Sequence, residues 1–170
     1  TCGIGTDDVT YCWGDNAAGQ TSDAIWNGTS GTRSRKQPQP IVDLVGTASL
    51  VKSGTDALYT CAITGTGNVE CWGTDFTGVH TDPYTVSGIS TAVDIAVAEN
   101  HTCAALSDGT VQCWGSNASG QLGDGTTTNS GVPVTVSGVT TASVVYTYDD
   151  YTCAGLTDGT YTCWGSKAGW

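Results

Sequence analysis

His101 to Gly115 reads HTCAALSDGTVQCWG, a segment that the chain repeats with small changes. Two close copies are Tyr59 to Gly73 (YTCAITGTGNVECWG) and Tyr151 to Gly165 (YTCAGLTDGTYTCWG), and a fourth copy is Thr1 to Gly14 (TCGIGTDDVTYCWG). The first cysteines of successive copies lie 59, 42 and 50 residues apart. That period is typical of propeller blades and is too long for leucine-rich or ankyrin repeats.

Each copy is expected to form a β-hairpin, because short β-branched runs flank a turn and no segment has helical periodicity. In the third copy, counting inward from Cys103 and Cys113 pairs Leu106 with Thr110. The count leaves a three-residue loop that ends in Gly109, at the position that needs a positive φ. The same count gives loops at residues 65–67 and 157–159, and it places Asp8 at this position in the first copy.

The eight cysteines form four C-x9-C pairs, one in each copy. In the expected hairpin register, the two cysteines of a pair face one another at a separation that a disulfide can bridge. Each bridge should contribute roughly 2 to 3 kcal/mol by restricting the unfolded chain. Disulfides persist in oxidising compartments, so we expect an extracellular or cell-surface protein. The expected disulfides are Cys2–Cys12, Cys61–Cys71, Cys103–Cys113 and Cys153–Cys163.

A second pattern recurs between the copies, in Pro83 to Val97 (PYTVSGISTAVDIAV) and Pro133 to Val145 (PVTVSGVTTASVV), with a degenerate version in Pro40 to Val51 (PIVDLVGTASLV). It predicts one strand near Pro-x-x-Val and another near the following apolar run. With the hairpin, each repeat then supplies four antiparallel strands, which is the blade of a β-propeller. We therefore expect an all-β, single domain over residues 1–170, with about three and a half to four blades of four strands.

Composition excludes several classes of protein. Only 12% of the residues are charged, which argues against a coiled coil, and 14 aromatic residues argue against disorder. The net charge of −11 should repel nucleic acid and anionic lipid. No window approaches the roughly 18 apolar residues that a membrane span needs. We expect neither a nucleic-acid partner nor a membrane span.

One segment, HTCAALSDGTVQCWGSNASGQLGDGTTTNSGVPVTV, resembles a repeat of the regulator of chromosome condensation (RCC1) family in the disulfide-bearing form common in predicted secreted bacterial proteins. Its motif DG-x-V-x-C-W-G-x-N-x-x-GQLG-x-G spans one blade, and repeats of this type cover essentially the whole chain. The first two copies depart from the motif, because Thr21 follows Gln20 in place of Leu-Gly and Gly78-Val79 replaces Gly-Gln.

The resemblance implies a propeller, often of seven blades, that acts as a rigid platform for protein contacts. Family activities include nucleotide exchange on a small GTPase, β-lactamase inhibition and scaffolding within surface proteins. The expected disulfides conflict with a nuclear exchange role. We therefore predict an extracellular structural or interaction protein, a subunit of a surface fibre or adhesin assembled head to tail. A monomeric binding or inhibitory propeller and a carbohydrate-binding module stay open as alternatives.

The sequence favours no enzyme, cofactor or metal site. Asp outnumbers Glu by 14 to 2, but turn formation explains the many Asp residues. Neither an EF-hand spacing nor a G-G-x-G-x-D repeat is present. His80 and His101 are isolated from any nucleophile motif, and paired cysteines leave no thiol for catalysis.

Candidate interface residues are those outside the repeat. Trp26 and Trp170 have no counterpart in other copies, and Trp is favoured at interface hot spots. The Pro-containing insert 33–40, RSRKQPQP, holds three of the five basic residues. It is either a solvated insertion or a contact for an acidic surface, such as another copy of the chain. The interface candidates are Trp26, Trp170, Arg33, Arg35 and Lys36.

Three N-x-S/T sequons begin at Asn27, Asn100 and Asn117. We expect Asn117 to be the most accessible glycan acceptor, because it lies in a loop after Cys-Trp-Gly. The recurring Trp13, Trp72, Trp114 and Trp164 are instead interpreted as packing residues between blades.

The ends of the sequence predict how blades are completed. Residue 1 falls inside the hairpin motif, and residue 170 lies five residues after the last Cys-Trp-Gly. The first hairpin lacks the preceding apolar strand and the last lacks the following Pro-x-x-Val strand. Proteins normally cover such strand edges. The two end segments could share one blade, but we expect a neighbouring copy to supply the strands in a filament or homo-oligomer. Another surface or secreted protein is the alternative partner.

Overall fold

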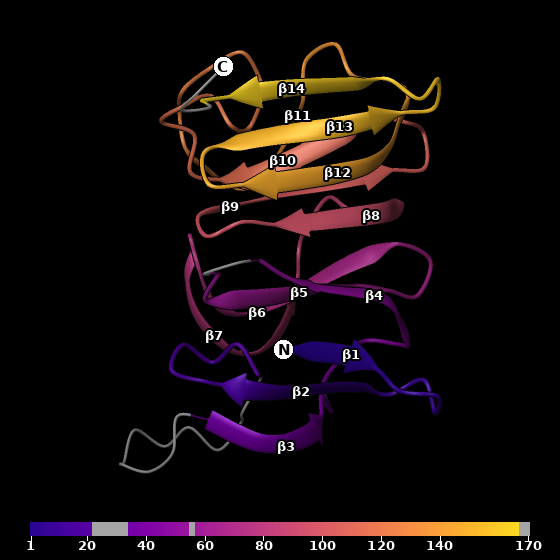
Figure 1. Cartoon of the computed structure of the whole chain (residues 1–170), viewed down its shortest axis with the longest axis vertical. Coiled ribbons are helices and arrows are strands. Elements are labelled where there is room, and N and C mark those ends of the chain that lie inside the picture. Colours follow the sequence, from indigo (N-terminus) through magenta and orange to yellow (C-terminus); the bar gives the residue numbers. More distant parts are fainter. Residues whose placement is uncertain (22–33, 55–56, 167–170) are drawn as a thin grey trace.

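A computed structural model describes residues 1–21, 34–54 and 57–166. The described residues form four antiparallel sheets and contain no helix, so none that could span a membrane. The sheets follow one another in chain order along the long axis of the molecule (Figure 1). We call them blades 1 to 4. The all-β prediction of a small number of propeller-like blades is confirmed.

The strands of each blade are neighbours in sequence. Blade 1 contains β1 (Cys2–Ile4), β2 (Thr10–Asp15) and β3 (Ser34–Pro40). Blade 2 contains β4 (Ala48–Ser53), β5 (Tyr59–Thr64), β6 (Asn68–Asp75) and β7 (Gly78–Thr85). Blade 3 contains β8 (Ala92–Val97), β9 (His101–Leu106), β10 (Val111–Gly115) and β11 (Ser130–Thr135). Blade 4 contains β12 (Ala142–Tyr148), β13 (Tyr151–Leu156) and β14 (Tyr161–Gly165).

The hairpin of each blade has the predicted register. In blade 3, the Leu106 N–H donates to the Thr110 carbonyl at 2.9 Å, and Gly109 has a φ of 83°. Asp8 takes the same left-handed conformation in blade 1, with a φ of 61°. Asp108 accepts from the hydroxyl and the N–H of Thr110, and these hydrogen bonds lower the pKa of Asp108. The abundant Asp residues therefore serve turn formation here, as expected.

All four predicted disulfides are present, each within its own hairpin. Every pair has a Cα–Cα distance of 4.1 Å and a sequence separation of 10. No cysteine is free. The bridges are Cys2–Cys12, Cys61–Cys71, Cys103–Cys113 and Cys153–Cys163.

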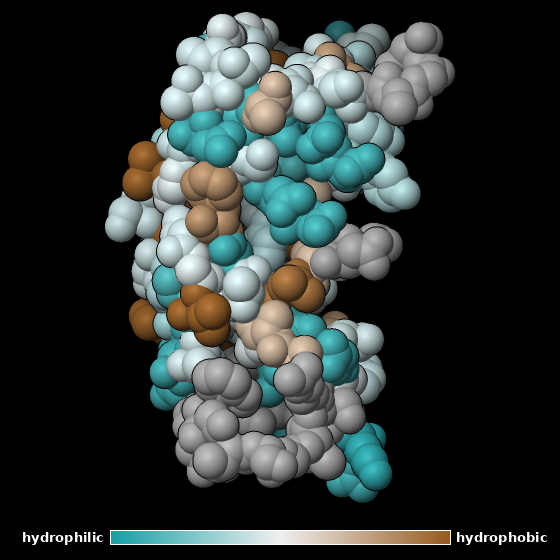
Figure 2. Space-filling view, turned by 90° about the vertical axis from the view of Figure 1, so that its left-hand side faces the viewer, coloured by the Kyte–Doolittle hydropathy of each residue, from teal (hydrophilic) through white to brown (hydrophobic). Residues whose placement is uncertain are grey.

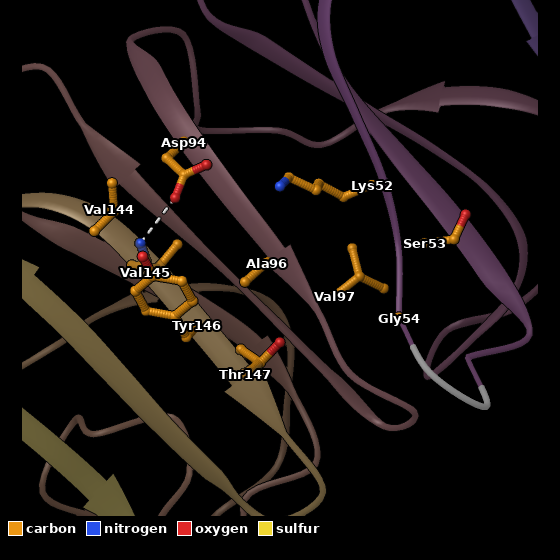
Figure 3. Close-up of a pocket in the computed structure, with 10 residues that line it drawn as sticks. All are labelled: Lys52, Ser53, Gly54, Asp94, Ala96, Val97, Val144, Val145, Tyr146 and Thr147. Atoms are coloured by element: carbon orange, nitrogen blue, oxygen red, sulfur yellow. Dashed lines mark hydrogen bonds between the residues drawn. The ribbon is translucent and has the colours of Figure 1, made fainter. Parts of the chain in front are cut away.

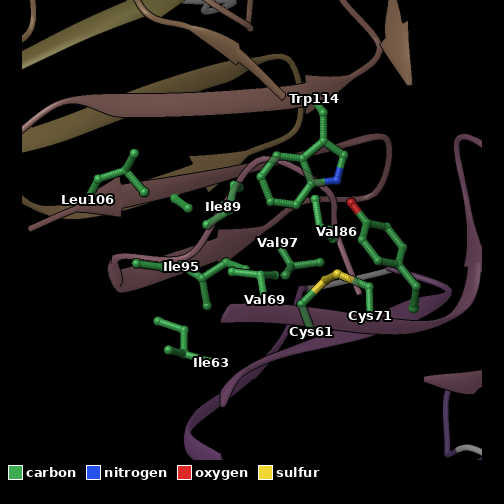
Figure 4. Close-up of a cluster of buried hydrophobic side chains, with 13 residues drawn as sticks. Cys61, Ile63, Val69, Cys71, Val86, Ile89, Ile95, Val97, Leu106 and Trp114 are labelled. Carbon is green, nitrogen blue, oxygen red and sulfur yellow. A yellow bond between two sulfur atoms is a disulfide. The ribbon is translucent and has the colours of Figure 1, made fainter. Parts of the chain in front are cut away.

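The hydrophobic core lies between consecutive blades, in three separate clusters. The largest joins blade 2 to blade 3, where the Cys61–Cys71 disulfide packs with Val69 against Ile95 and Trp114 (Figure 4). The disulfides belong to this core, because both sulfurs of the blade 2 and blade 3 bridges are fully buried. The disulfides therefore reinforce a thin core that contains few large aliphatic residues. The smaller clusters join blade 1 to blade 2 and blade 3 to blade 4.

The basic insert contains an edge strand, and its side chains at residues 36–40 are exposed. Residues Ser34–Pro40 form β3 and pair with β2, with Gln39 opposite Cys12. This register aligns Pro38, not Pro40, with the prolines of β7 and β11. The predicted strand was therefore displaced by two residues. Proline is tolerated here because an edge strand needs no second row of hydrogen bonds.

Blades 1 and 4 lie at opposite ends of the stack (Figure 1). The two end segments therefore do not combine into one shared blade. Within the described residues, blade 1 has no counterpart of the inner strands β4, β8 and β12, and blade 4 has no counterpart of the outer strands β3, β7 and β11.

Candidate interaction surfaces

The loop after Cys-Trp-Gly fastens one blade to the next. In blade 1, the backbone carbonyl of Gln20 accepts the indole N–H of Trp72 at 3.0 Å and the hydroxyl of Thr60 at 3.1 Å. Both donors belong to the hairpin of blade 2. The Thr before the first cysteine and the Trp after the second cysteine thus supply the hydrogen-bond donors of a blade interface. The equivalent bonds run from Trp164 (2.9 Å) and Thr152 (2.9 Å) to the Gln121 carbonyl.

Asn117 shapes this loop from the inside, and its expected role as an accessible glycan acceptor is wrong. The side chain is completely buried. Its Oδ1 accepts the Leu122 N–H at 2.9 Å, and its Nδ2 donates to the Thr128 carbonyl at 3.0 Å. The side-chain amide hydrogen-bonds to backbone groups of the loop in place of backbone partners, and it faces away from solvent. Asn100 is exposed and stays a candidate acceptor, whereas Asn27 lies outside the described residues.

A second contact between blades comes from the residue before Thr-Cys. The Tyr59 hydroxyl lies 2.7 Å from Thr102 Oγ1 of the next blade, and His101 Nε2 lies 2.9 Å from Thr152 Oγ1. Because the Thr152 hydroxyl donates to a carbonyl, His101 carries its proton on Nε2. His101 Nδ1 is buried without a partner. Burial therefore lowers the pKa of His101 from 6.5 to about 4.

We expect His101→Tyr to reduce the acid sensitivity of the fold. The folded-state pKa of His101 lies below 6.5, so the unfolded chain takes up the proton first and stability falls from about pH 6.5 toward pH 4. The loss should reach about 2–3 kcal/mol. Tyrosine does not titrate in this window and occupies the same motif position in blade 2 as Tyr59. Urea unfolding at pH 7 and pH 4.5 measures the difference, and equal losses in both proteins would contradict this role of His101.

The outward face of blade 4 is rich in tyrosine. Side chains alternate across a sheet, so Tyr146, Cys153 and Cys163, which lie opposite one another, point away from blade 3. Tyr146, Tyr148 and Tyr161 are 54%, 60% and 66% exposed. The ring centroids of Tyr146 and Tyr161 are 6.4 Å apart. In blades 2 and 3 the corresponding face is core, because the next blade covers it.

The outward face of blade 1 carries the residues that serve as hydrogen-bond donors in the internal blade interfaces. Trp13 and Thr1 occupy the motif positions that Trp72 and Thr60 occupy in blade 2. No described residue accepts a hydrogen bond from the Trp13 indole. A shallow hollow of about 220 Å³ on this face is lined by Gly3, Ile4, Gly5, Tyr11, Trp13 and Pro38.

On the side of the stack, by contrast, the surface has no single apolar area. Figure 2 shows hydrophobic residues dispersed among hydrophilic ones on the side that it presents. Such scattered residues are normal for a protein surface and indicate no docking site. This side therefore offers less for a partner than the two ends.

A groove lies on the inner side of the stack, between β4, β8 and β12 (Figure 3). Its volume is about 380 Å³. Asp94 Oδ2 accepts the Val145 N–H at 2.9 Å, so one carboxylate oxygen has no described partner. Thr147 Oγ1 is buried without a hydrogen-bond partner. The lining residues are Lys52, Ser53, Gly54, Asp94, Ala96, Val97, Val144, Val145, Tyr146 and Thr147.

A polar cluster on the β6–β7 hairpin resembles a catalytic triad only in composition. Thr77 Oγ1 is 2.8 Å and Asp75 Oδ1 is 3.5 Å from His80, and both approach the same nitrogen, Nε2. A relay needs the acid on the opposite ring nitrogen. Among the described residues, no three His, Cys, Asp or Glu side chains are grouped so that they could hold a metal ion.

Most of the proposed interface residues fall beyond the described part of the chain. Trp26, Arg33 and Trp170 lie outside the described residues, and Arg35 is described only through the backbone of β3. Lys36 is exposed on β3. The sequence did not single out Tyr146, Tyr161 or Lys52, whose positions in the repeat could have marked them.

Comparison with known proteins supports the repeat assignment. Family models described as the regulator of chromosome condensation (RCC1) repeat match residues 92–121 and 108–147. The chain is an RCC1-like repeat protein. The two matches cover blade 3 and the inner strand of blade 4, and the internal repeat extends the assignment to the other blades. No curated protein sequence matched the chain.

Solved structures show the same fold for the RCC1-like chain. Human WBSCR16 has a TM-score of 0.78 at 18% identity, over 92% of this chain and 42% of that chain. Yeast RCC1 (Prp20), in a structure with Kap60, has a TM-score of 0.77 at 19% identity, over 96% and 41%. The ectodomain of the Physcomitrella patens receptor kinase CR4 has 0.58 at 17% identity, over 97% and 38%. The chain thus spans about two fifths of the length of these structures.

Proposed function

We propose that this RCC1-like chain is a protein-interaction module that assembles head to tail. The outward face of blade 4 in one copy binds the outward face of blade 1 in the next. One observation supports this most strongly: the described residues build the same blade interface three times, and the outward faces of blades 1 and 4 carry the two halves of that interface. Such a heterologous contact propagates into a filament unless it closes.

The two end faces offer complementary chemistry. Trp13 lies on blade 1 at the position where the indole N–H groups of Trp72 and Trp164 donate to a backbone carbonyl of the preceding blade. Tyr161 takes the position that Val69 and Val111 hold in the buried faces of blades 2 and 3, because all three lie two residue pairs from the disulfide, toward the turn. Tyrosine has a large apolar ring and a polar hydroxyl. It therefore suits a surface that is in contact with water in the free chain and with a partner in the assembly.

Charge limits this association. A net charge of −11 makes two copies repel one another at low ionic strength. Salt screens such repulsion, so assembly should strengthen as salt is raised. The basic strand β3, which includes Arg35 and Lys36, belongs to blade 1 and therefore lies at the same end of the stack as the Trp13 face.

An extracellular fibre or adhesin is the setting that we propose for this assembly. The four disulfides in four hairpins support this setting, because disulfides persist in oxidising compartments and are rare in the cytosol. The protein-binding role follows the fold, and the yeast relative is seen bound to Kap60. A durable polymer would use the bridges to keep each hairpin folded outside the cell.

Tyr161→Ser should weaken head-to-tail assembly at least tenfold, because a hot-spot tyrosine contributes about 2 kcal/mol or more to an interface. Val132→Ser is the matched control, since Val132 on the side of blade 3 is 64% exposed against 66% for Tyr161. Sedimentation velocity over a concentration series measures the association. A native chain that stays a 17.3 kDa monomer at high concentration would contradict assembly and favour the monomeric binding propeller.

A further inference from the structure

We propose that Tyr161 of one copy inserts into the hollow on the outward face of blade 1 of the next copy. The inference rests on the proposed head-to-tail assembly and names the contact that fixes its register. The hollow has a volume of about 220 Å³, which is below the roughly 300–1,000 Å³ of a small-molecule site, so a single side chain suits it better. The lining residues are Gly3, Ile4, Gly5, Tyr11, Trp13 and Pro38.

Two glycines line the hollow at positions where the other blades carry larger residues. Gly3 follows the first cysteine of its hairpin, where every other blade has alanine. Gly5 lies two residues further along, where the other blades have threonine or leucine. The absent side chains leave the space that the hollow occupies. The corresponding residues are Ala62, Ala104 and Ala154 for Gly3, and Thr64, Leu106 and Leu156 for Gly5.

Two aromatic side chains line the same hollow. The Tyr11 hydroxyl donates to Asp7 Oδ2 at 2.7 Å, which holds the Tyr11 ring in place. A Cβ atom at Gly3 would lie 3.8 Å from Cη2 of Trp13, so the indole borders the space beside Gly3. Aromatic rings pack favourably on one another in offset or edge-to-face arrangements. The hollow therefore favours an aromatic occupant.

The outward face of blade 4 carries an enlarged residue at the matching position. In the internal clusters, Val69 packs in the same core as Ala104 and Leu106, and Val111 in the same core as Ala154 and Leu156. At the two ends of the stack, tyrosine replaces this valine and glycine replaces both the alanine and the leucine. The larger residue on one end face thus compensates for the smaller residues on the other.

Tyr161 suits the hollow better than its neighbour Tyr146. Tyr161 belongs to the hairpin of blade 4, and the hollow is lined mainly by the hairpin of blade 1, so the two are equivalent parts of their blades. Tyr146 belongs to the inner strand β12, whereas blade 1 has no inner strand among the described residues. The two ring centroids are 6.4 Å apart, which makes Tyr146 a matched control.

A double-mutant cycle, followed by sedimentation velocity over a concentration series, tests the contact. Gly3→Val fills the hollow, and Gly3 accepts a side chain because it lies in β1 without a positive φ. Tyr161→Val restores the residue of blades 2 and 3. Each single variant should weaken assembly about tenfold or more. The double variant should be no weaker than Tyr161→Val alone, because a valine no longer needs the space that Gly3→Val removes.

Tyr161→Phe should weaken assembly about threefold or less, because the ring and not the hydroxyl fills the hollow. In the control cycle of Gly3→Val with Tyr146→Val, the two effects should multiply. Amide spectra show whether each variant is folded. If Gly3→Val is not, Gly3→Ala takes its place in the cycle, with a smaller effect of the same sign, since the other three blades have alanine there.

The outcomes separate this contact from the assembly itself. If the native chain assembles but the effects of Gly3→Val and Tyr161→Val multiply, to about a hundredfold, the contact is wrong and head-to-tail assembly stands. If Gly3→Val is instead coupled to Tyr146→Val, the hollow takes Tyr146 and the assignment of Tyr161 is wrong. A native chain that stays monomeric at high concentration overturns both the assembly and the contact.

Discussion

Trp72→Ala should lower the free energy of unfolding by about 3–5 kcal/mol, because it removes a large, fully buried side chain from the interface of blades 1 and 2. The substitution also deletes the 3.0 Å bond from the indole to the Gln20 carbonyl. Among the residues that the structure describes, the Thr60 hydroxyl is then the remaining donor to that carbonyl. Guanidinium unfolding followed by circular dichroism measures the loss.

Trp13→Ala is the matched control, since Trp13 holds the same motif position on the outward face of blade 1. It is only partly buried, so we expect a loss of at most about 1–2 kcal/mol. Trp72→Phe keeps one aromatic ring but loses the hydrogen bond and the second ring of the indole, so its loss should lie between those of Trp13→Ala and Trp72→Ala. Equal losses for Trp13→Ala and Trp72→Ala would show that the blade interface does not hold the fold together.

Removing the Cys103–Cys113 disulfide by a double replacement with alanine should cost about 3 kcal/mol in loop entropy, plus the packing of two fully buried sulfurs. The Cys153–Cys163 bridge closes a loop of the same length, with a separation of 10, but it lies on the open face of blade 4. The difference between the two double variants therefore isolates packing. We expect the blade 3 variant to be less stable by about 1–2 kcal/mol.

Urea unfolding of both variants, beside the native chain, measures these free energies. The comparison of the two variants also reports on the outward face of blade 4. The expected difference applies at protein concentrations where the chain is monomeric and the outward face of blade 4 is open. In the assembled chain the next copy packs on Cys153 and Cys163, so the difference between the two losses should shrink.

The local structure was predictable because it depends on residues close together in sequence. Cys103, Cys113 and Gly109 fix the hairpin by counting alone, and every copy obeys the same count. The degenerate first repeat was harder. Pro38 and Pro40 both fit a Pro-x-x-Val strand loosely, and only pairing with β2 decides between them.

The surfaces depended on contacts that no local pattern shows. Asn117 looks like a loop residue, but its amide replaces the missing backbone partners of the loop and is buried. Lys52 and Tyr146 come from different repeats, and both line one groove because the inner strands of successive blades lie side by side. Their shared position in the repeat was visible in the sequence, but the order of the inner strands was not.

Electron microscopy of the native protein at physiological salt tests the proposed assembly most directly. The account predicts filaments in which the Tyr161 face of each copy lies against the Trp13 face of the next, with Trp13 within hydrogen-bonding distance of a carbonyl from its neighbour. Discrete single copies, or copies joined through the sides of the blades with both end faces bare, would contradict it.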